Sequence, residues 1–258
     1  MIAVVDYQKG NLKSVERGLI AAGGEAFITA DASEIAKADA IVLPGVGAFA
    51  DAAATMCELG QIEAIRDRVR AGVPFLGICL GEHLMFEHGV EGAPEGNPAC
   101  GLGLLPGTVV AMPRCDAQGK AFKVPHVGWN TIEIPACGGS AAVPPCGEGG
   151  GNAVLKQSSL RCGTARGTSP DSAPQPGSDL AFACPLFDGI APGEYFYFTH
   201  SYIAPTGSHT IAETAHSTRF TSAVQFGERA FGVQFHPEKS SDAGARVLAN
   251  FVAIAARG

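Results

Sequence analysis

Short apolar runs alternate with amphipathic segments over the first 86 residues of this 258-residue chain, and this alternation constrains the fold more than any other feature. Apolar runs typical of buried strands occupy residues 2–6, 25–29, 40–43 and 75–78. Helical patterns begin at residues 12, 33, 61 and 80, and the last two extend to residues 71 and 86. Repeated strand–helix units predict a mostly parallel sheet that is covered by helices on both faces.

The second half of the chain has a different pattern, in which strands follow one another with little helix between them. The alternation and aromatic content of strands occur at residues 123–134, 195–203, 209–214, 220–226 and 231–235. The last two strands flank Gly227 and predict a hairpin, and residues 242–256 predict a closing helix. The predicted fold class is α/β, with a mostly parallel central sheet flanked by helices and extended by antiparallel strands from the second half.

Residues 137–179 differ in composition from the rest of the chain. These 43 positions hold 9 Gly and 5 Pro but no aromatic residue. A segment with so few large apolar side chains cannot bury enough surface to offset its chain entropy. We therefore predict a single domain over residues 1–258 that carries a flexible, low-complexity surface insertion at 137–179.

Charge and cysteine content argue against several function classes. The net charge of −7 argues against nucleic acid or an anionic membrane as a partner. No apolar run reaches the roughly 18 residues that span a bilayer, and the first ten residues do not resemble a signal peptide. The eight cysteines include no C-x-x-C pair, which gives zinc little support. We therefore expect a cytoplasmic protein with reduced thiols, no metal and no cofactor.

The candidate nucleophile is Cys79, which stands between a buried strand and a helix, with Gly77 and Gly81 on either side. This G-x-C-x-G pattern is the cysteine version of a nucleophile elbow, in which glycines permit a tight turn and hold the side chain strained and exposed. Amides at the start of the following helix favour the thiolate, and the amide of Leu80 is placed to bind an oxyanion. The alternative is a buried structural cysteine at a tight packing contact.

A general base is available at the end of the last strand, where Pro237 and Glu238 follow His236. Residues two apart in an extended chain project to the same side, so His236 is placed to accept the proton of Cys79 while Glu238 orients the imidazole. Proline restricts the preceding residue to extended geometry, which supports this arrangement. The alternative is a solvated loop histidine beside a surface carboxylate.

Residues 43–50 contain a glycine pattern, G-x-G-x-x-A, that also occurs in dinucleotide sites. The pattern follows the third strand and not the first, and the acidic residues about 20 positions later lie in a helical pattern, so a dinucleotide site is not supported. We interpret Gly45, Val46 and Gly47 as a loop that turns a backbone amide toward a reacting carbonyl. The histidines and glutamate in residues 83–88 match neither zinc-protease spacing, so no metal site is predicted.

Six segments occur in an order that resembles a known family. They are DYQKGNLKSV at 6–15, LPGVGAF at 43–49, GICLG at 77–81, PHVGWN at 125–130, YFTHSY at 197–202 and GVQFHPEKS at 232–240. The third and sixth segments are similar to motifs of class I glutamine amidotransferases, whereas the first, fourth and fifth resemble the glutaminase subunit of imidazole glycerol phosphate synthase. The resemblance covers residues 2–134 and 184–252.

The resemblance implies a mechanism that agrees with the local chemistry. Cys79 would attack the side-chain amide of L-glutamine, His236 would act first as base and then as acid, and Glu238 would orient it. Hydrolysis of the resulting thioester would leave glutamate and ammonia. The ammonia would pass to a separate cyclase subunit, a (β/α)₈ barrel, which makes imidazole glycerol phosphate and AICAR in histidine biosynthesis.

The resemblance also implies roles for residues outside the triad. The amide of Leu80 and one amide from the loop Gly45–Gly47 would hold the oxyanion. The positions that hold substrate glutamine correspond to His83, Ser201 and Tyr202. The positions that face the cyclase correspond to Asn11, Trp129 and Lys239. Without the resemblance, Trp129 would be expected in the core.

Departures from the family pattern bear on the predicted site. Glu82 and His83 stand where the family usually has Met and Gln, and residues 215–217 stand where it tends to have Tyr-Gly. An imidazole lacks the paired donor and acceptor of an amide, which puts the affinity for glutamine in question. Three rival functions stay open: a glutaminase subunit for a different synthase, a docking scaffold with an impaired glutaminase site, and a free-standing γ-glutamyl hydrolase.

Overall fold

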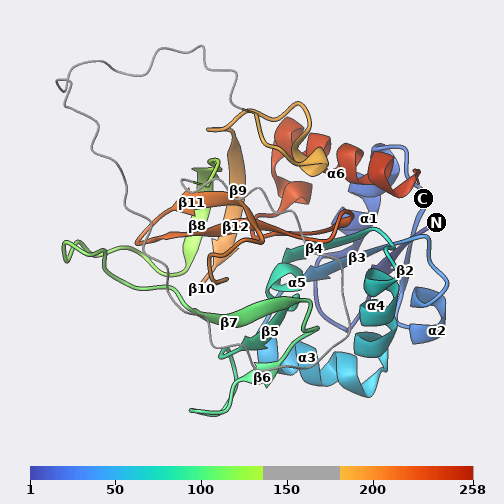
Figure 1. The fold of residues 1–258 in the computed structure, drawn as a ribbon, viewed down its shortest axis with the longest axis horizontal. Coiled ribbons are helices and arrows are strands. Elements are labelled where there is room, and N and C mark those ends of the chain that lie inside the picture. The colour runs from blue at the N-terminus through green and yellow to red at the C-terminus, as the bar shows by residue number, and fades with distance from the viewer. Residues whose placement is uncertain (136–180, 258) are drawn as a thin grey trace, which may run out of the picture.

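The computed structural model describes residues 1–135 and 181–257, and the predicted insertion at 137–179 lies outside these ranges. A central sheet lies between two layers of helices, with smaller sheets beside it (Figure 1). The central sheet has seven strands in the order β11-β12-β13-β4-β3-β1-β2. Their bounds are β1 (Ile2–Val5), β2 (Ala26–Thr29), β3 (Ala40–Gly45), β4 (Phe75–Cys79), β11 (Thr210–Ala215), β12 (Arg219–Phe226) and β13 (Ala230–Val233).

Five neighbouring strands of the central sheet, from β13 to β2, run parallel. The strand β12 pairs antiparallel with β13, and β11 pairs antiparallel with β12, so the second half of the chain extends one edge of the parallel sheet. The turn between β12 and β13 is the predicted hairpin, where Gly227 has a φ of +60° that favours glycine. The predicted fold class is confirmed.

Helices cover both faces of the central sheet (Figure 1). One face carries α1 (Leu12–Ala21) and α6 (Ser241–Ala255), and the other carries α2 (Ala32–Ile35), α3 (Phe49–Glu58) and α4 (Gln61–Arg70). In β1, Ile2 and Val4 pack into the core beneath α1 and α6, whereas Ala3 and Val5 pack into the core beneath the other three helices. Because both faces of the strand are buried, its sequence is an uninterrupted apolar run.

The helix that follows Cys79 is shorter than predicted. The helix α5 spans only Leu80–His83, and the chain then enters the strand β5 (Phe86–Gly89). The prediction of one helix over residues 80–86 is wrong because β5 pairs in parallel with a distant strand, an arrangement that a local apolar pattern cannot reveal. That second sheet has the order β10-β7-β5-β6, with β6 (Ala99–Cys100), β7 (Leu105–Ala111) and β10 (Tyr202–Ile203).

Two predicted strands form a small sheet of their own. The strand β8 (His126–Thr131) pairs antiparallel with β9 (Tyr195–His200), and neither joins the central sheet. The strands β8 and β9 therefore do not extend the central sheet as predicted, although Glu133, just after β8, forms an antiparallel bridge with Glu213 of β11. Two short 3₁₀ helices, η1 (Pro185–Phe187) and η2 (Pro237–Lys239), precede β9 and α6 respectively. The helix α3 was not predicted, because its run of alanines gives a weak amphipathic signal.

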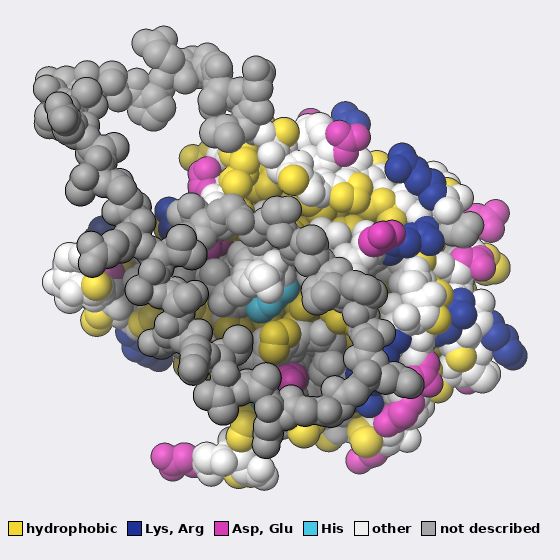
Figure 2. All heavy atoms as spheres, in the orientation of Figure 1, with side chains coloured by type: hydrophobic (Ala, Val, Ile, Leu, Met, Phe, Trp, Pro, Cys, Tyr) yellow, Lys and Arg dark blue, Asp and Glu magenta, His cyan; other side chains and the backbone are white. Residues whose placement is uncertain are grey.

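Charged side chains of both signs are interspersed on the surface. On the face shown in Figure 2, basic and acidic residues alternate over the right-hand side, where Figure 1 places α1, α2 and α4. Lys13 and Glu16 on α1 form one such pair, with 2.9 Å between nitrogen and oxygen. Such exposed pairs contribute little to stability, about 0.3–0.5 kcal/mol each on a helix. Within residues 1–135 and 181–257, no helix is long and apolar enough to cross a bilayer.

Candidate active site

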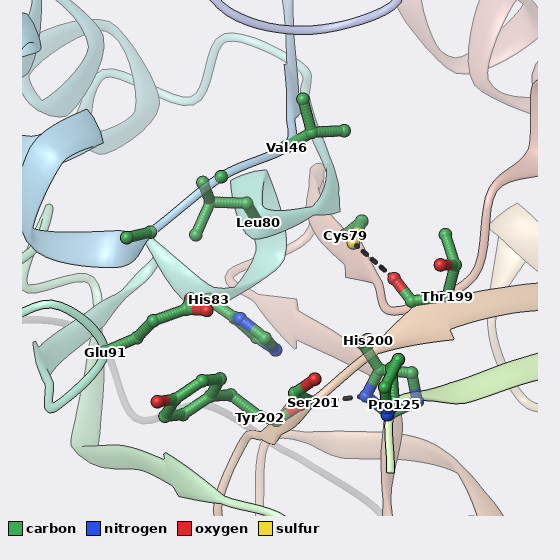
Figure 3. A pocket seen from close by; sticks show the side chains of 12 residues that line it. Val46, Cys79, Leu80, His83, Glu91, Pro125, Thr199, His200, Ser201 and Tyr202 are labelled. Carbon is green, nitrogen blue, oxygen red and sulfur yellow. Dashed lines mark hydrogen bonds between the residues drawn. The ribbon is translucent and has the colours of Figure 1, made fainter.

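The carboxyl ends of β3 and β4 lie side by side, and a cavity of about 480 Å³ opens beside them. Gly45 and Cys79, the last residues of these strands, are partners in the parallel register. Ligands of parallel α/β sheets bind at this edge. Seven of the predicted site residues line the cavity (Figure 3): Val46, Gly47, Cys79, Leu80, His83, Ser201 and Tyr202.

The backbone of Cys79 is strained. Its φ of +54° and ψ of −108° lie in a region that a residue with a side chain rarely adopts. A side chain at Gly81 would collide with the carbonyl oxygen of Leu43, and one at Gly77 with that of Gly81. The two glycines therefore allow strands and helix to approach closely, and the strain lies on Cys79 itself. The side chain is largely buried, so the prediction of an exposed thiol is wrong, although the thiol does face the cavity.

His236 and Glu238 form a buried pair. His236 Nδ1 lies 2.9 Å from Glu238 Oε1, and both side chains are almost inaccessible to solvent. The backbone of His236 is extended, as the following proline predicts, but Glu238 lies in the 3₁₀ turn η2 and not in an extended strand. The predicted pairing is present, but the tight turn η2 produces it and extended geometry does not. The alternative of a solvated loop histidine is wrong.

The charge state of His236 follows from this pairing. Burial alone lowers the pKa of the imidazole, but the interactions with Cys79 and Glu238 outweigh burial and raise the pKa from 6.5 to about 9. Glu238 accepts the hydrogen bond from Nδ1, whereas Nε2 is buried without a hydrogen-bond partner among the described residues. The influence of Cys79 on the pKa places the thiol close to this free nitrogen, an arrangement that suits a nucleophile and its proton carrier.

The predicted oxyanion loop adjoins the nucleophile. Gly45 ends β3 and packs so closely against Tyr7 and Leu80 that a side chain there would collide with both. Gly47 has a φ of +106°, which only glycine adopts without strain. Val46 and Gly47 line the cavity, whereas Gly45 lies behind them. The Leu80 amide begins α5 directly after the sulfur-bearing residue.

His83 forms part of the cavity wall on the α5 side (Figure 3). Its Nε2 lies 2.6 Å from Oε1 of Gln234. Burial lowers the pKa of His83 to about 4, so the ring is neutral at physiological pH. One ring nitrogen of the residue predicted to contact glutamine is therefore already bonded within the protein.

A buried histidine pair supports the opposite wall, which Ser201 and Tyr202 form. His200 Nδ1 donates to the carbonyl oxygen of Tyr202 at 2.8 Å, and its Nε2 lies 3.0 Å from Nδ1 of His126. Burial lowers the pKa values of His200 and His126 to about 3 and about 4. His216, from the departure at 215–217, stacks on His126 with 4.2 Å between ring centroids. The neutral rings of His200 and His126 thus hold the wall in place.

Sequence reasoning missed several residues of the site. The sulfur of Cys79 lies 3.9 Å from the carbonyl oxygen of Thr199 and 3.8 Å from Nε2 of Gln234. Glu91, Pro125 and His200 also line the cavity. For Gln234 a signal existed, because it stands two positions before His236 and so projects to the same side. Within the described ranges, no group of His, Cys, Asp or Glu is arranged to hold a metal ion.

The three residues predicted to face a partner lie at or near the surface. Trp129 on β8 is 51% exposed, so the expectation of core packing is wrong. Its ring meets Tyr197 edge-on, with 6.1 Å between centroids, and the ammonium of Lys239 lies 6.0 Å from the centre of the same tyrosine ring. Asn11 is exposed at the start of α1, where its Oδ1 accepts a hydrogen bond from Ser14. Trp129 projects outward because β8 belongs to a two-stranded sheet with an open face.

The comparison with known proteins agrees with this geometry. Residues 3–255 match the family model described as glutamine amidotransferase class-I. A crystal structure of a glutamine amidotransferase is similar in fold, with a TM-score of 0.60 at 17% identity over 99% of this chain and 100% of that one. The chain belongs to the class I glutamine amidotransferase family.

Within that family, the chain is similar to a subunit of one synthase. It is 38% identical to imidazole glycerol phosphate synthase subunit HisH of Moorella thermoacetica, over 97% of this chain and 93% of that protein. It is 37% identical to subunit HisH of Rhodopirellula baltica, over 97% of this chain and 96% of that protein. The resemblance predicted from the six sequence segments is confirmed.

Proposed function

We propose that this chain is the glutaminase subunit of an imidazole glycerol phosphate synthase in the cytoplasm. It hydrolyses L-glutamine to glutamate and ammonia and supplies the ammonia to a cyclase subunit that makes imidazole glycerol phosphate and AICAR in histidine biosynthesis. The observation that carries the proposal is a strained, cavity-facing Cys79 beside the buried pair of His236 and Glu238. Similarity to HisH subunits supports the choice of synthase.

The reaction begins at the sulfur of Cys79. The thiolate attacks the side-chain carbonyl carbon of glutamine, so that a C–S bond forms and the carbonyl oxygen becomes an oxyanion. The amide of Leu80 and one amide from the loop Gly45–Gly47 stabilise this charge. His236 then gives its Nε2 proton to the amide nitrogen, the C–N bond breaks, and ammonia leaves a thioester on Cys79.

Water completes the cycle. His236, now neutral, takes a proton from a water molecule that attacks the thioester carbon. The C–S bond breaks, glutamate leaves, and Cys79 returns to the thiolate beside a protonated His236. Glu238 accepts a hydrogen bond from Nδ1 throughout, which keeps Nε2 directed at the reacting atoms. His83, Ser201 and Tyr202 surround the space beside Cys79 and are placed to hold the rest of the glutamine.

The cyclase binds a surface that we define by Val127, Trp129, Tyr195, Tyr197 and Lys239 and call the docking face. Val127, Trp129 and Tyr195 are each more than half exposed, although their side chains are large and apolar. Neighbouring exposed side chains of this kind are typical of protein interfaces. The strand β9 carries the two tyrosines and leads directly to Ser201 in the cavity wall, so the docking face adjoins the site where ammonia forms. Asn11, exposed at the start of α1, is a further position at which the resemblance predicts contact with the cyclase.

Glutamate release tests the proposal. We expect glutaminase activity to rise strongly when both the cyclase subunit and its ribulosyl substrate are present. The Cys79→Ala variant should be inactive, whereas Cys57→Ala, which removes an exposed thiol on α3, should behave as the wild type. Activity that ignores the cyclase would contradict the choice of synthase, and inactivity under every condition would favour a docking scaffold.

The role of the docking face can be tested with one variant on this face and a control variant elsewhere on the surface. Trp129→Ala should weaken binding of the cyclase by about 1–3 kcal/mol, because aromatic anchors dominate interface energies. Val110→Ala removes an apolar side chain of comparable exposure on β7, away from this face, and should leave the affinity unchanged. Equal affinities of both variants, measured by titration calorimetry, would place the cyclase elsewhere.

A further inference from the structure

Gln234 lies beside the nucleophile and has no role in the mechanism so far. It follows β13 directly, is completely buried, and stands two positions before His236. Its Nε2 lies 3.8 Å from Sγ of Cys79, within hydrogen-bonding distance for sulfur. The sulfur therefore has a hydrogen-bond donor beside it, in addition to the carbonyl oxygen of Thr199 at 3.9 Å, and this donor comes from the same chain segment that supplies the base.

The orientation of the Gln234 amide depends on His83. The distance from His83 Nε2 to Gln234 Oε1 is 2.6 Å, and an amide oxygen can only accept a hydrogen bond. His83 must therefore carry its proton on Nε2 and donate it. With Oε1 engaged in this way, the NH₂ group is the end of the amide that faces Cys79, with 3.8 Å between Nε2 and the sulfur.

The surroundings keep His83 in this form. Glu82, on the same helix, is completely buried, and its Oε2 lies 4.0 Å from His83 Nε2, too far for a hydrogen bond. Neither carboxyl oxygen of Glu82 has a hydrogen-bond partner among the described residues. Burial raises the pKa of Glu82 well above its usual value, which favours the neutral acid, and burial lowers the pKa of His83 to about 4, which disfavours a second proton on the imidazole.

We propose that Gln234 is a further catalytic residue, which donates a hydrogen bond to the Cys79 thiolate, and that His83 is the positioning residue that turns the amide toward the sulfur. The inference rests on the proposed role of Cys79 as nucleophile. A donor to sulfur stabilises the thiolate before attack and stabilises it again as the leaving group when water hydrolyses the thioester. Gln234 then stabilises the negative charge on sulfur, and His236 carries the proton.

Alkylation of Cys79 by iodoacetamide tests this without glutamine or a partner subunit. The rate is followed by the mass of the Cys79 peptide as a function of pH, because only the thiolate reacts. Gln234→Leu removes the donor, and the midpoint of the pH–rate profile should rise by about one unit, a tenfold loss of rate on its acidic side. His83→Leu should shift the midpoint in the same direction, because the amide is no longer held.

Conservative variants separate this role from a merely structural one. His83→Gln can still donate to Gln234 Oε1 and should restore the wild-type midpoint, whereas Gln234→Glu keeps the shape but places an acceptor against the sulfur and should raise the midpoint further. An unchanged midpoint in Gln234→Leu and Gln234→Glu overturns the proposal. If those variants do not fold, equal midpoints in His83→Leu and His83→Gln overturn it instead. Missing glutaminase activity in a chain whose midpoints shift as expected contradicts the proposed function alone.

Discussion

Two histidine–glutamate pairs flank the nucleophile, and they are in opposite states. In the pair after β13, His236 and Glu238 are hydrogen-bonded at 2.9 Å, and the pKa of the histidine is raised to about 9. In the pair on α5, His83 and Glu82 are 4.0 Å apart, the pKa of the histidine is lowered to about 4, and the pKa of the glutamate is raised. Both pairs are buried, so burial alone does not explain the difference.

Local backbone geometry explains it. Consecutive residues on a helix point in directions about 100° apart, so the side chains of Glu82 and His83 cannot face each other. The turn η2 folds Glu238 back onto His236, so that the hydrogen bond forms and the charged pair becomes favourable. The same two residue types therefore form a hydrogen-bonded pair, which we propose carries the proton, in one place and an unbonded pair in the other.

The largest expected difference between the pairs is in catalysis. His236→Gln removes the group that carries the proton and should lower the kcat of glutamine hydrolysis by about a thousandfold or more. The matched substitution His83→Gln should change kcat by less than about tenfold, since Gln can keep the bond to Gln234. Steady-state glutamate release in the presence of the cyclase measures both, and comparable losses would mean that the pairs are not functionally distinct.

The second difference is in the pH dependence of stability. The pKa of His236 is about 9 in the folded chain and 6.5 otherwise, so its stabilising contribution is complete below pH 6.5 and is lost as the pH rises to 9. The whole contribution amounts to at most about 3 kcal/mol. Because Cys79 and Glu238 both raise this pKa, Glu238→Gln should flatten only part of the slope of unfolding free energy against pH. Urea unfolding from pH 6 to 9.5 measures it, and a wild-type slope in the variant would show that Glu238 does not hold the proton.

Replacing the acid of the pair on α5 should raise stability, whereas replacing the acid of the other pair lowers it. Glu82 is buried without a partner among the described residues, so Glu82→Met should stabilise the chain by about 1–3 kcal/mol near neutral pH. Because the pKa of Glu82 is raised from 4.5, the acid destabilises the fold increasingly as the pH rises above 4.5, and the gain should grow with pH from that point. Thermal unfolding at pH 5 and pH 8 measures this, and a loss of stability in the variant would reveal a partner for Glu82.

The smallest expected effect is on substrate affinity. In the wild type, Nε2 of His83 is bonded to Gln234, so the ring can offer the substrate only the acceptor Nδ1. In His83→Gln the amide can bond Gln234 and still offer both a donor and an acceptor, so KM for glutamine should fall by roughly threefold to tenfold. Initial rates over a range of glutamine concentrations test this, and an unchanged KM would show that His83 does not contact the substrate.

Much of the fold was predictable because burial on both faces marks the parallel strands directly. Residues 2–5 and 75–79 are uninterrupted apolar runs, since each strand contributes to both cores. The second sheet was not predictable from such local patterns. Phe86 pairs with Leu105 across the sheet, and only that partner decides between strand and helix for the residues after Cys79. The placement of β8 and β9 outside the central sheet likewise depends on pairing and not on composition.

Prediction of the candidate site from sequence was also limited to features that are visible in local patterns. Cys79 stands out in sequence because two glycines flank it and permit close packing, and His236 and Glu238 stand out because a proline lies between them and restricts the backbone. For Gln234 the sequence offers only its position two residues before His236, because its importance lies in contacts with residues more than 150 positions away. Trp129 was first expected in the core because its large ring favours burial, whereas the open face of β8 leaves it in solvent.

The positive φ of Cys79 has a consequence for selection. A residue with a side chain pays about 1–3 kcal/mol to stay in such a conformation, and glycine would relieve most of that strain. A Cys79→Gly chain should therefore be more stable than the native one and entirely inactive. Selection for folding alone would favour glycine at this position, because glycine raises the stability of the fold. A copy of the gene that is no longer selected for catalysis should therefore replace this cysteine.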